Sequence, residues 1–491
     1  MLEQTYPTQA DKLPTGVTGL DEILGGGLIP NHSYLLRGGP GTGKTTTALH
    51  FLQQGCRRGE SVSFISLHEP PENIQKNAER FGFVLENIHY LDLSPSADLL
   101  SKNESYTIFS AAEVEGVDTT QRILDHIEEF QPSRLVIDSL SHLRYLSERP
   151  FHFRRQVIAL QKCLRQKGIT VLFLSECLEG SNEDMDIQHL VDGIIHLKST
   201  ARTRYIRVSK YRGSGFRGGY HPMSITQKGI EVYRRLEPKA HLKQPDYKAM
   251  SSGIPSLDEL LHGGIERGTI SIISGPTGVG KTTLGVQFMK EAAGRGENSA
   301  IYTFEEQPEI LLRRCEAMNI PVRTMIKNGN LSLARIEPLD VYADQFAQRV
   351  KKDIEDKDVK IVMIDSIAGY QLSLLGEDEA MTATEHLHAL CKYLQNVGVT
   401  VILINEMEHV IGRFKATSLG VSYLADNIVF LQYTEQRGQL ERAIGILKKR
   451  LSSFEHSIHS FELTQYGLKV GEEITHIQGI LSGTAEIIEP S

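Results

Sequence analysis

The residues RGGPGTGKTT at positions 37–46 recur as SGPTGVGKTT at positions 274–283. Both copies contain the pattern GxxxxGK[ST], at Gly38–Thr45 and Gly275–Thr282, which is typical of loops that cradle nucleotide phosphates. The glycines let backbone N–H groups turn inward around a phosphate, because no Cβ obstructs them. Each copy also follows an apolar run that predicts a strand and begins a run that predicts a helix, whose N-terminus attracts anions. This context distinguishes a nucleotide-binding loop from an ordinary glycine-rich turn.

The repetition extends far beyond the two loops. Residues 16–28 (GVTGLDEILGGGL) resemble residues 253–265 (GIPSLDELLHGGI), 237 positions later. Further matching pairs keep this offset or stay close to it: Lys44 and Lys281, Glu69 and Glu306, Asp138 and Asp365, Lys210 and Lys448. A co-linear period of this length predicts one duplicated domain rather than a solenoid. We expect domains at residues 1–240 and 241–491, joined near the polar segment 237–250.

Each half alternates short apolar runs with helical patterns. In the first half, strands are expected at 32–38, 61–67, 134–140 and 169–176, and helices at 45–58, 71–82 and 154–168. In the second half, strands are expected at 268–275, 298–306, 360–367 and 399–406, and a helix at 282–294. Strands that alternate with helices indicate an α/β fold, in which a mostly parallel sheet is flanked by helices.

Composition limits the class of protein. Of 491 residues, 40% are hydrophobic and 23% charged, which is typical of globular domains and excludes a disordered chain. Lys and Arg total 53 against 61 Asp and Glu, and this net charge of −8 argues against nonspecific binding of nucleic acid. The five cysteines form no CxxC pair, so we expect a reducing, cytoplasmic location. The chain shows neither an apolar signal segment nor an apolar run long enough to span a membrane.

The two loops predict ATP sites in which Lys44 and Lys281 contact the β- and γ-phosphates. Thr45 and Thr282 offer hydroxyl groups to Mg²⁺. The loop residues expected to bind ATP are Gly39, Gly41, Thr42, Gly43, Lys44, Thr45 and Thr46 in the first half, and Gly278, Val279, Gly280, Lys281, Thr282 and Thr283 in the second.

Acidic residues end several of the predicted strands. Asp138 and Asp365 close the runs LVID and IVMID, at the sheet edge where the loops lie, and are expected to hold Mg²⁺ through water. Glu305 and Glu306 follow the run IYTF, where a carboxylate could orient or deprotonate a nucleophile near the γ-phosphate. The alternative is a solvated acidic pair at a helix start, where negative charge is favourable anyway.

The first half differs at the position of these glutamates. His68 and Glu69 replace the acidic pair, so one carboxylate is left. Either Glu69 or His68 could act as the base at this site, and the sequence does not decide between them.

Cations end a later strand in each half, as Lys210-Tyr211-Arg212 and Lys448-Lys449-Arg450. Because strand side chains alternate between faces, the first and third residues of each triplet share a face and could approach one anion together. A solvated strand end is the alternative for such a pair taken alone.

Taken together, the co-linear duplication, the GLDEILGGG opening, the paired loops, the IDS strand ends and the FEE acids resemble the KaiC family of RecA-like proteins. The resemblance covers roughly residues 12–485 and implies tandem RecA-like domains, the first an ATPase and the second an ATPase and serine/threonine autokinase. It also implies a homohexamer with ATP between subunits, where each cation triplet contacts the ATP of the neighbour. Phe81 and Met318 are expected near the adenine.

The same resemblance implies phosphoacceptor hydroxyls just before the strand DNIVFLQY at 426–433. Ser422 matches the serine acceptor, and Tyr423 stands where the family has threonine, so it could be an acceptor, a packing residue or a steric block. Thr417 matches a nearby threonine. The given sequence ends with LSGTAEIIEPS at 481–491, and the resemblance implies a longer tail that binds a partner, so we expect such partner-dependent control to be in doubt here.

Three functions therefore compete. The first is an ATP-dependent autokinase and ATPase in signalling or timing, reporting to a partner protein. The second is a RecA-type motor on DNA, for which the basic and aromatic segment 210–221 could contact phosphates. The third is an ATP-sensing scaffold, in which ATP only stabilises the assembly.

Overall fold

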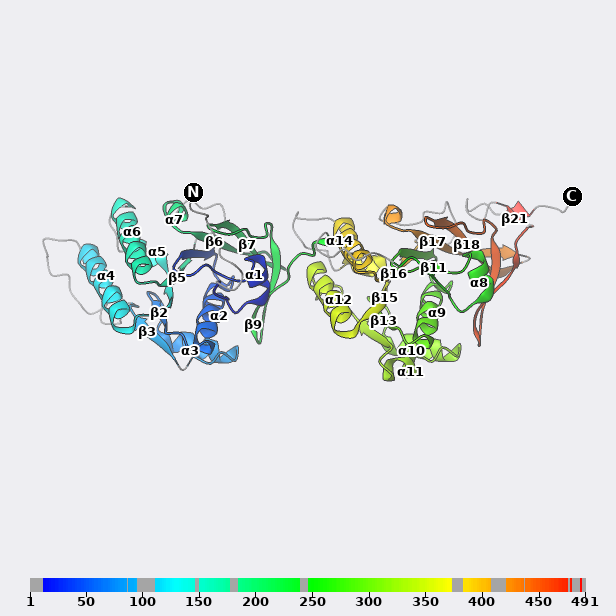
Figure 1. Cartoon of the computed structure of the whole chain (residues 1–491), viewed down its shortest axis with the longest axis horizontal. Helices are drawn as coiled ribbons and strands as arrows, with labels where there is room; N and C mark the ends of the chain where they lie inside the picture. The colour runs from blue at the N-terminus through cyan, green and yellow to red at the C-terminus, as the bar shows by residue number, and fades with distance from the viewer. Residues whose placement is uncertain are drawn as a thin grey trace. The chain divides into compact units, whose positions relative to one another are not determined.

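A computed structural model describes residues 12–85, 87–94, 111–145, 150–176, 184–238, 246–372, 383–407, 421–436, 438–475, 477–478 and 486–487. The chain forms two compact units, Met1–Arg234 and Arg235–Ser491 (Figure 1). The division thus lies a few residues before the expected junction. Residues 239–245 of that junction are outside the described residues.

The N-terminal unit begins with a helix and continues as alternating strands and helices. In chain order its elements are α1 (Thr18–Ile23), β1 (Ser33–Gly38), α2 (Lys44–Arg57), β2 (Val62–Ser66), α3 (Pro71–Arg80), β3 (Ile88–Asp92), α4 (Ala111–Phe130), β4 (Arg134–Asp138), α5 (Leu140–Tyr145), α6 (Pro150–Gln166), β5 (Thr170–Ser175), α7 (Met185–Leu190), β6 (Gly193–Ser199), β7 (Arg204–Tyr211), β8 (His221–Thr226) and β9 (Gly229–Val232).

The C-terminal unit repeats this order after a short strand. Its elements are β10 (Ala249–Met250), α8 (Pro255–Leu260), β11 (Ile265–Glu266), β12 (Ile270–Gly275), α9 (Lys281–Gly294), β13 (Asn298–Thr303), α10 (Pro308–Ala317), α11 (Val322–Lys327), β14 (Leu331–Arg335), α12 (Ala343–Lys357), β15 (Val359–Asp365), α13 (Ile367–Leu372), α14 (Ala383–Asn396), β16 (Thr400–Glu406), the 3-10 turn η4 (Val421–Tyr423), β17 (Asn427–Gln436), β18 (Gln439–Lys449), β19 (His459–Thr464), β20 (Gly467–Glu473), β21 (Ile477–Gln478) and β22 (Glu486–Ile487).

The two large sheets share one topology. The strand order is β3-β2-β4-β5-β1-β6-β7-β8-β9 in the first unit and β14-β13-β15-β16-β12-β17-β18-β19-β20 in the second. The pairs from β3 to β6 are parallel, and β6 to β9 pair antiparallel; the second sheet does the same. The expected fold class, tandem duplicated RecA-like domains with mostly parallel sheets flanked by helices, is confirmed.

Helices cover both faces of each sheet, as Figure 1 shows for the N-terminal unit. Alternate residues of β1 enter different cores: Tyr34 and Leu36 pack with α1, α2 and α3, whereas Leu35 packs with α4 to α7. In the C-terminal unit, α8 to α11 cover one face and α12 to α14 the other. Burial on both faces explains why the central strands read as continuous apolar runs.

This topology places the phosphate loops. Each loop leaves the carboxyl end of a central strand, β1 or β12, whose neighbours on both sides are parallel to it. Ligands of open α/β sheets bind at this edge. Among the described residues, no helix is both long and apolar enough to cross a membrane.

Candidate nucleotide-binding sites

Four of the loop glycines are required by close backbone packing or by a positive φ. A Cβ on Gly38 would lie 2.5 Å from the carbonyl oxygen of Leu197 on β6, and Gly275 would meet the carbonyl of Leu431 on β17 in the same way. Gly43 and Gly280, which precede α2 and α9, have φ values of 100° and 118°, a region that L-residues disfavour. All the loop residues predicted to bind ATP therefore lie in two equivalent turns or in the first turn of the following helix.

The loop lysines are buried against their own loops. Lys44 Nζ donates to the carbonyl oxygens of Gly38 and Gly39, both at 3.0 Å, and Lys281 Nζ donates to Pro276 O at 2.8 Å. Burial lowers the pKa of both lysines, and neighbouring carboxylates oppose that shift. Each ammonium is thus held at the loop that would surround a phosphate.

A hydroxyl and a carboxylate meet beside each lysine. Thr45 Oγ1 donates to Asp138 Oδ2 at 3.1 Å, and Thr282 Oγ1 donates to Asp365 Oδ2 at 2.7 Å. Burial raises the pKa of Asp138, and it raises the pKa of Asp365 to about 6. A positive charge at this point would stabilise the ionised carboxylates.

These oxygens fit the Mg²⁺ chemistry expected of the site. Mg²⁺ takes oxygen ligands and usually keeps several waters, binding through one or two protein groups and substrate phosphates. Among the described residues, no group of three or more His, Cys, Asp and Glu side chains is placed to hold a metal ion. The candidate magnesium positions are the pairs Thr45–Asp138 and Thr282–Asp365, whose oxygens meet beside the loops.

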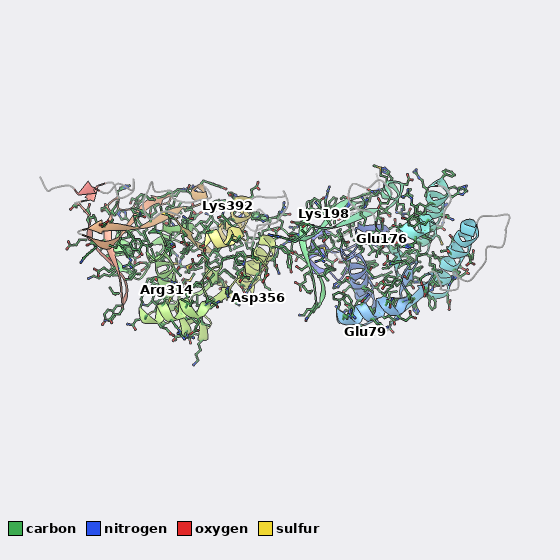
Figure 2. The ribbon with its side chains drawn as sticks, turned by 180° about the vertical axis from the view of Figure 1, so that it is seen from behind. Glu79, Glu176, Lys198, Arg314, Asp356 and Lys392 are labelled. Carbon is green, nitrogen blue, oxygen red and sulfur yellow. The ribbon has the colours of Figure 1, made fainter. Side chains whose placement is uncertain are left out.

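The two glutamates of the C-terminal unit have different surroundings. Glu305 Oε1 accepts a short hydrogen bond from the hydroxyl of Ser366, the residue after Asp365. Glu306 instead forms an ion pair with Arg314 on α10 at 2.8 Å; Figure 2 labels Arg314 beside that helix. Burial is the main cause of the raised pKa of Asp365, and both glutamates add to it, Glu305 more than Glu306. Glu305 is thus the carboxylate nearer the Thr282–Asp365 pair.

In the N-terminal unit, His68 occupies the place of Glu305. Both residues follow their strand by two positions, and those strands are in equivalent register with β4 and β15. His68 Nδ1 lies 3.9 Å from Asp138 Oδ1, and its ring stacks on His142 with centroids 5.2 Å apart. Glu69 is anchored through its backbone, because its carbonyl accepts a hydrogen bond from Ser66 Oγ at 2.5 Å. The ring of His68 therefore faces the buried acid.

A further acid was not predicted from the sequence. Glu176 follows β5 and Glu406 ends β16, on the strands beside the loop strands; Figure 2 labels Glu176. Glu406 is in register with Gly275, the first glycine of its loop. Burial lowers the pKa of each loop lysine, and the glutamate of the same unit makes the largest contribution that opposes this shift: Glu176 for Lys44 and Glu406 for Lys281. The matching strand ends LSE and INE were the available signal.

The cation triplets lie at the opposite ends of the sheets from the loops of their own units. Lys210 pairs with Ile194 of β6, which lies beside Leu35 in the amino-terminal half of β1. The loop begins at Gly38, at the carboxyl end of the same strand. Lys210 Nζ donates to Gln188 O at 2.8 Å and His189 O at 3.2 Å. The Tyr211 side chain points inward, and its hydroxyl donates to Gly27 O at 2.6 Å.

The second triplet contacts the predicted acceptor segment. Lys448 Nζ donates to Ser422 O at 3.1 Å, and Arg450 Nη2 donates to Tyr423 O at 3.3 Å. Lys449 is buried and forms an ion pair with Glu266 at 3.1 Å. The first and third residues of each triplet thus share one face, and the middle side chain enters the interior.

Tyr423 is half-exposed and stacks on His388 of α14. Their ring centroids are 5.9 Å apart, and the tyrosine hydroxyl lies 3.3 Å from His388 Nδ1. Thr417 lies outside the described residues. Of the two residues expected near adenine, Met318 is buried in a core and Phe81 packs beside Phe83.

Comparison with known proteins adds the family context. A family model described as "ATPase: KaiC" matches residues 13–237 and 250–475. The chain is 27% identical over 493 residues to a circadian clock oscillator protein KaiC of Prochlorococcus marinus, covering 97% of this chain and 95% of the relative. The KaiC of Parasynechococcus marenigrum is 28% identical over 490 residues, with coverages of 97% and 93%. The circadian clock protein KaiC3 of a Synechocystis species is 27% identical over 491 residues, with coverages of 96% and 94%.

Proposed function

The chain belongs to the KaiC family of ATPases, and from that membership we propose that it hydrolyses ATP and phosphorylates itself within a homohexameric ring. Each ATP lies between neighbouring subunits, with Mg²⁺ at the threonine and aspartate pairs. The first domain, residues 1–240, is mainly an ATPase, and the second, residues 241–491, also transfers the γ-phosphate to a serine of the neighbour. Its role is in signalling or timing, read by a partner protein.

One observation carries this proposal: each unit holds its loop and its cations at opposite ends of the same sheet. Lys210 lies level with Leu35 of β1 (Ser33–Gly38), three residues before Gly38, so at about 3.3 Å per residue the loop begins roughly 10 Å away along the strand direction. That separation exceeds the length of a lysine or arginine side chain. Lys210 and Arg212 are therefore available to an ATP held by another copy, as are Lys448 and Arg450.

The chemistry assigned to the C-terminal site is an in-line phosphoryl transfer. A hydroxyl oxygen of the neighbouring subunit forms a bond to the γ-phosphorus, the bond from that phosphorus to the bridging oxygen breaks, and ADP leaves. Glu305 accepts the hydroxyl proton. Lys281 and the neighbour's Lys448 and Arg450 stabilise the charge of the transferred group, and Mg²⁺ held by Thr282 and Asp365 would supply further positive charge.

Ser422 is the proposed acceptor. It is half-buried, and its carbonyl is fixed by Lys448 of the same chain at 3.1 Å. A tyrosine hydroxyl lies much farther from its Cα than a serine hydroxyl does. A backbone placed so that a serine hydroxyl is in line with the γ-phosphate therefore does not place a tyrosine hydroxyl there. Tyr423 is accordingly assigned to packing against His388.

In the N-terminal site the nucleophile is water. His68 or Glu69 accepts its proton, and Lys44, Thr45 and Asp138 hold the nucleotide and its metal ion. Hydrolysis here needs no hydroxyl from the protein.

Phosphopeptide mapping after incubation with Mg-ATP tests the kinase assignment. We expect one phosphate on the peptide that contains Ser422, no phosphate at that site in Ser422→Ala, and a loss of transfer of about a hundredfold or more in Glu305→Gln. Glu306→Gln is the matched comparison, and it should lose less because Glu306 pairs with Arg314. Unchanged incorporation in Ser422→Ala would refute the acceptor.

The same samples separate the competing functions. ATP turnover without phosphate incorporation would favour a pure ATPase, and assembly without turnover would favour an ATP-sensing scaffold. ATPase stimulation by single-stranded DNA, lost at high salt, would favour the DNA motor.

A further inference from the structure

A buried aspartate stands behind the arginine of each cation triplet. Asp192 precedes β6 and Asp426 precedes β17, so the two are equivalent positions of the duplicated fold. Both are buried, with exposed fractions of 9% and 4%. In both units the backbone N–H of the arginine donates to the aspartate carbonyl at 2.9 Å.

The two carboxylate oxygens of each aspartate have separate partners. Asp192 Oδ2 accepts from the backbone N–H of Ser33 at 3.0 Å, and Asp426 Oδ2 accepts from the backbone N–H of Ile270 at 3.0 Å. Ser33 and Ile270 are the first residues of β1 and β12, the strands that lead to the phosphate loops. One oxygen therefore fixes the aspartate to the centre of its sheet.

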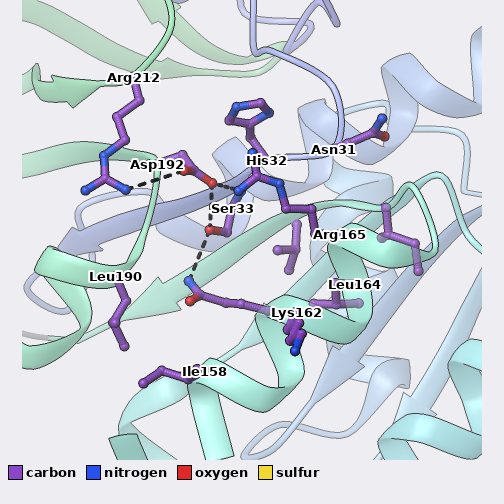
Figure 3. Close-up of a pocket in the computed structure, with 13 residues that line it drawn as sticks. Asn31, His32, Ser33, Ile158, Lys162, Leu164, Arg165, Leu190, Asp192 and Arg212 are labelled. Atoms are coloured by element: carbon purple, nitrogen blue, oxygen red, sulfur yellow. Dashed lines mark hydrogen bonds and ion pairs between the residues drawn. The ribbon is translucent and has the colours of Figure 1, made fainter. Parts of the chain in front are cut away.

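The other oxygen faces the arginine. Arg450 Nη1 donates to Asp426 Oδ1 at 3.1 Å, and Arg212 Nη1 lies 3.8 Å from Asp192 Oδ1. Figure 3 shows the first-unit arrangement, with Arg212 reaching toward Asp192 and Ser33 bound on its far side. Both arginines are more than half exposed, so only the aspartate end of each pair is rigid.

A glutamine completes the arrangement in both units. Gln161 of α6 donates to Ser33 Oγ at 3.1 Å, and that hydroxyl bonds Asp192. Gln395 of α14 donates directly to Asp426 Oδ2 at 3.0 Å. The same network of strand, aspartate, glutamine and arginine thus occurs twice, although the residues beside it differ between the halves.

We propose that Asp192 and Asp426 are positioning residues that direct Arg212 and Arg450 toward the ATP of the neighbouring subunit. Each aspartate limits the conformations of a long, exposed side chain, so less conformational freedom is lost when the arginine meets the transferred phosphate. The closer contact makes Asp426 the stronger of the two. They have this role only if the arginines act on ATP as proposed above.

Asp426→Asn distinguishes the roles of the two carboxylate oxygens, because it removes one acceptor and keeps the other. An asparagine oxygen still accepts from Ile270 N–H, whereas its NH₂ group faces Arg450 and cannot accept a hydrogen bond. We expect kcat of the C-terminal site to fall about two- to fivefold with little change in KM, since an exposed ion pair is lost and the site's own loop is untouched. Asp192→Asn should lower the N-terminal rate less.

A double-mutant cycle distinguishes positioning from a general structural role. The four proteins are the unmodified chain, Asp426→Asn, Arg450→Ala and the double variant. Their rates are measured by single-turnover ATP hydrolysis, so that slow rates remain measurable. The rate of a Lys281→Ala chain gives the N-terminal contribution, which is subtracted. If Asp426 acts through Arg450, Asp426→Asn has no further effect once Arg450 is alanine.

Two outcomes would overturn the role of Asp426. In the first, Asp426→Asn leaves the C-terminal rate of the otherwise unmodified chain unchanged. In the second, Asp426→Asn lowers that rate by the same factor whether residue 450 is arginine or alanine. If Arg450→Ala alone leaves the rate unchanged, the proposed function of the arginine fails instead, so the two failures are distinguishable. Asp358→Asn is the matched control, because the Asp358 side chain is 81% exposed and pairs with Lys360 at the surface. Its rate and its ring mass should match those of the unmodified protein.

Discussion

At the scale of single residues, the two nucleotide sites differ most at one position. His68 stands where the second unit has Glu305, and its ring nitrogen lies 3.9 Å from the buried Asp138. Glu69 is held through its backbone, because Ser66 Oγ donates a hydrogen bond to its carbonyl oxygen. His68 is therefore the better placed of the two candidate bases.

We predict that His68→Gln lowers hydrolysis at the N-terminal site by about a hundredfold, the usual size of a general-base contribution. Glu69→Gln should lower it much less. ATP turnover is measured in a Lys281→Ala chain, in which the C-terminal site is inactive, and binding of a fluorescent ATP analogue checks that the nucleotide still binds. The reverse ranking of the two variants would assign the base to Glu69.

Contiguous motifs made part of the site visible in the sequence. The loops, Asp138 and Asp365 lie at strand ends that an apolar run predicts directly. The roles of Glu176, Glu406, Asp192 and Asp426 could not be predicted in this way, because the relevance of these residues depends on which strand lies beside β1 or β12. That neighbour relation is set by the order of the sheet and becomes known only from the fold.

At the scale of elements, most of the central strands buried on both faces were predicted, although β6 was not. β1, β2, β4 and β5 are buried along their whole length and read as apolar runs. The edge strands β3 and β14 went unpredicted, and both have the same pattern of one buried residue followed by four more accessible ones. A half-exposed edge strand has neither a continuous apolar run nor a regular alternation of apolar and polar residues, and these are the patterns by which a strand is predicted from sequence.

Helices α12 and α14 enclose a buried acid and base. Asp344 and His386 lie 3.7 Å apart, and the side chain of Arg235 acts on both. Burial raises the pKa of Asp344 to about 6 and lowers the pKa of His386 to about 4. The folded state therefore holds the proton of Asp344 more tightly than the unfolded state does, and that of His386 less tightly.

The two shifts predict opposite pH dependences. Asp344 contributes stability that is present below its unfolded pKa of 3.8 and lost as pH rises toward 6, whereas His386 costs stability as pH falls from 6.5 toward 4. Relative to the unmodified chain at each pH, Asp344→Asn should gain stability with rising pH and His386→Gln with falling pH. We expect differences of about 1–3 kcal/mol across this range, from shifts of about two units.

Urea unfolding at a series of pH values between 4 and 7 measures both trends. The exposed Asp358→Asn should give a difference from the unmodified chain that does not vary with pH. If the two buried variants shift in the same direction, the acid and base are not held neutral in the folded state.

At the scale of the whole molecule, the proposed function requires a second chain, because each unit holds its loop and its cations at opposite ends of the sheet. A head-to-tail ring resolves this, because every subunit then presents its loop to one neighbour and its cations to the other. Such an assembly has a property that no single chain has: two different inactive subunits can restore each other's sites.

We predict this complementation for the C-terminal ring. Lys281→Ala removes a loop lysine and Arg450→Ala removes a trans cation, so each variant alone should have strongly reduced C-terminal activity. In a ring formed from equal amounts of both, an active site needs a subunit with an intact loop beside a neighbour with an intact arginine. Random assembly gives that arrangement at about one site in four, so about a quarter of the unmodified activity should return.

The control mixes Lys281→Ala with Thr282→Ala, which both damage the loop and so cannot complement. The variants are unfolded or dissociated, mixed, reassembled with ATP, and tested for turnover and phosphate on Ser422, with native mass measurement to verify mixed rings. Recovery in the first mixture alone locates the cations on the neighbouring subunit, because the loop and the arginine of an active site then come from different chains. Mixed rings without recovery would mean that loop and arginine act within one chain, which the length of β1 argues against.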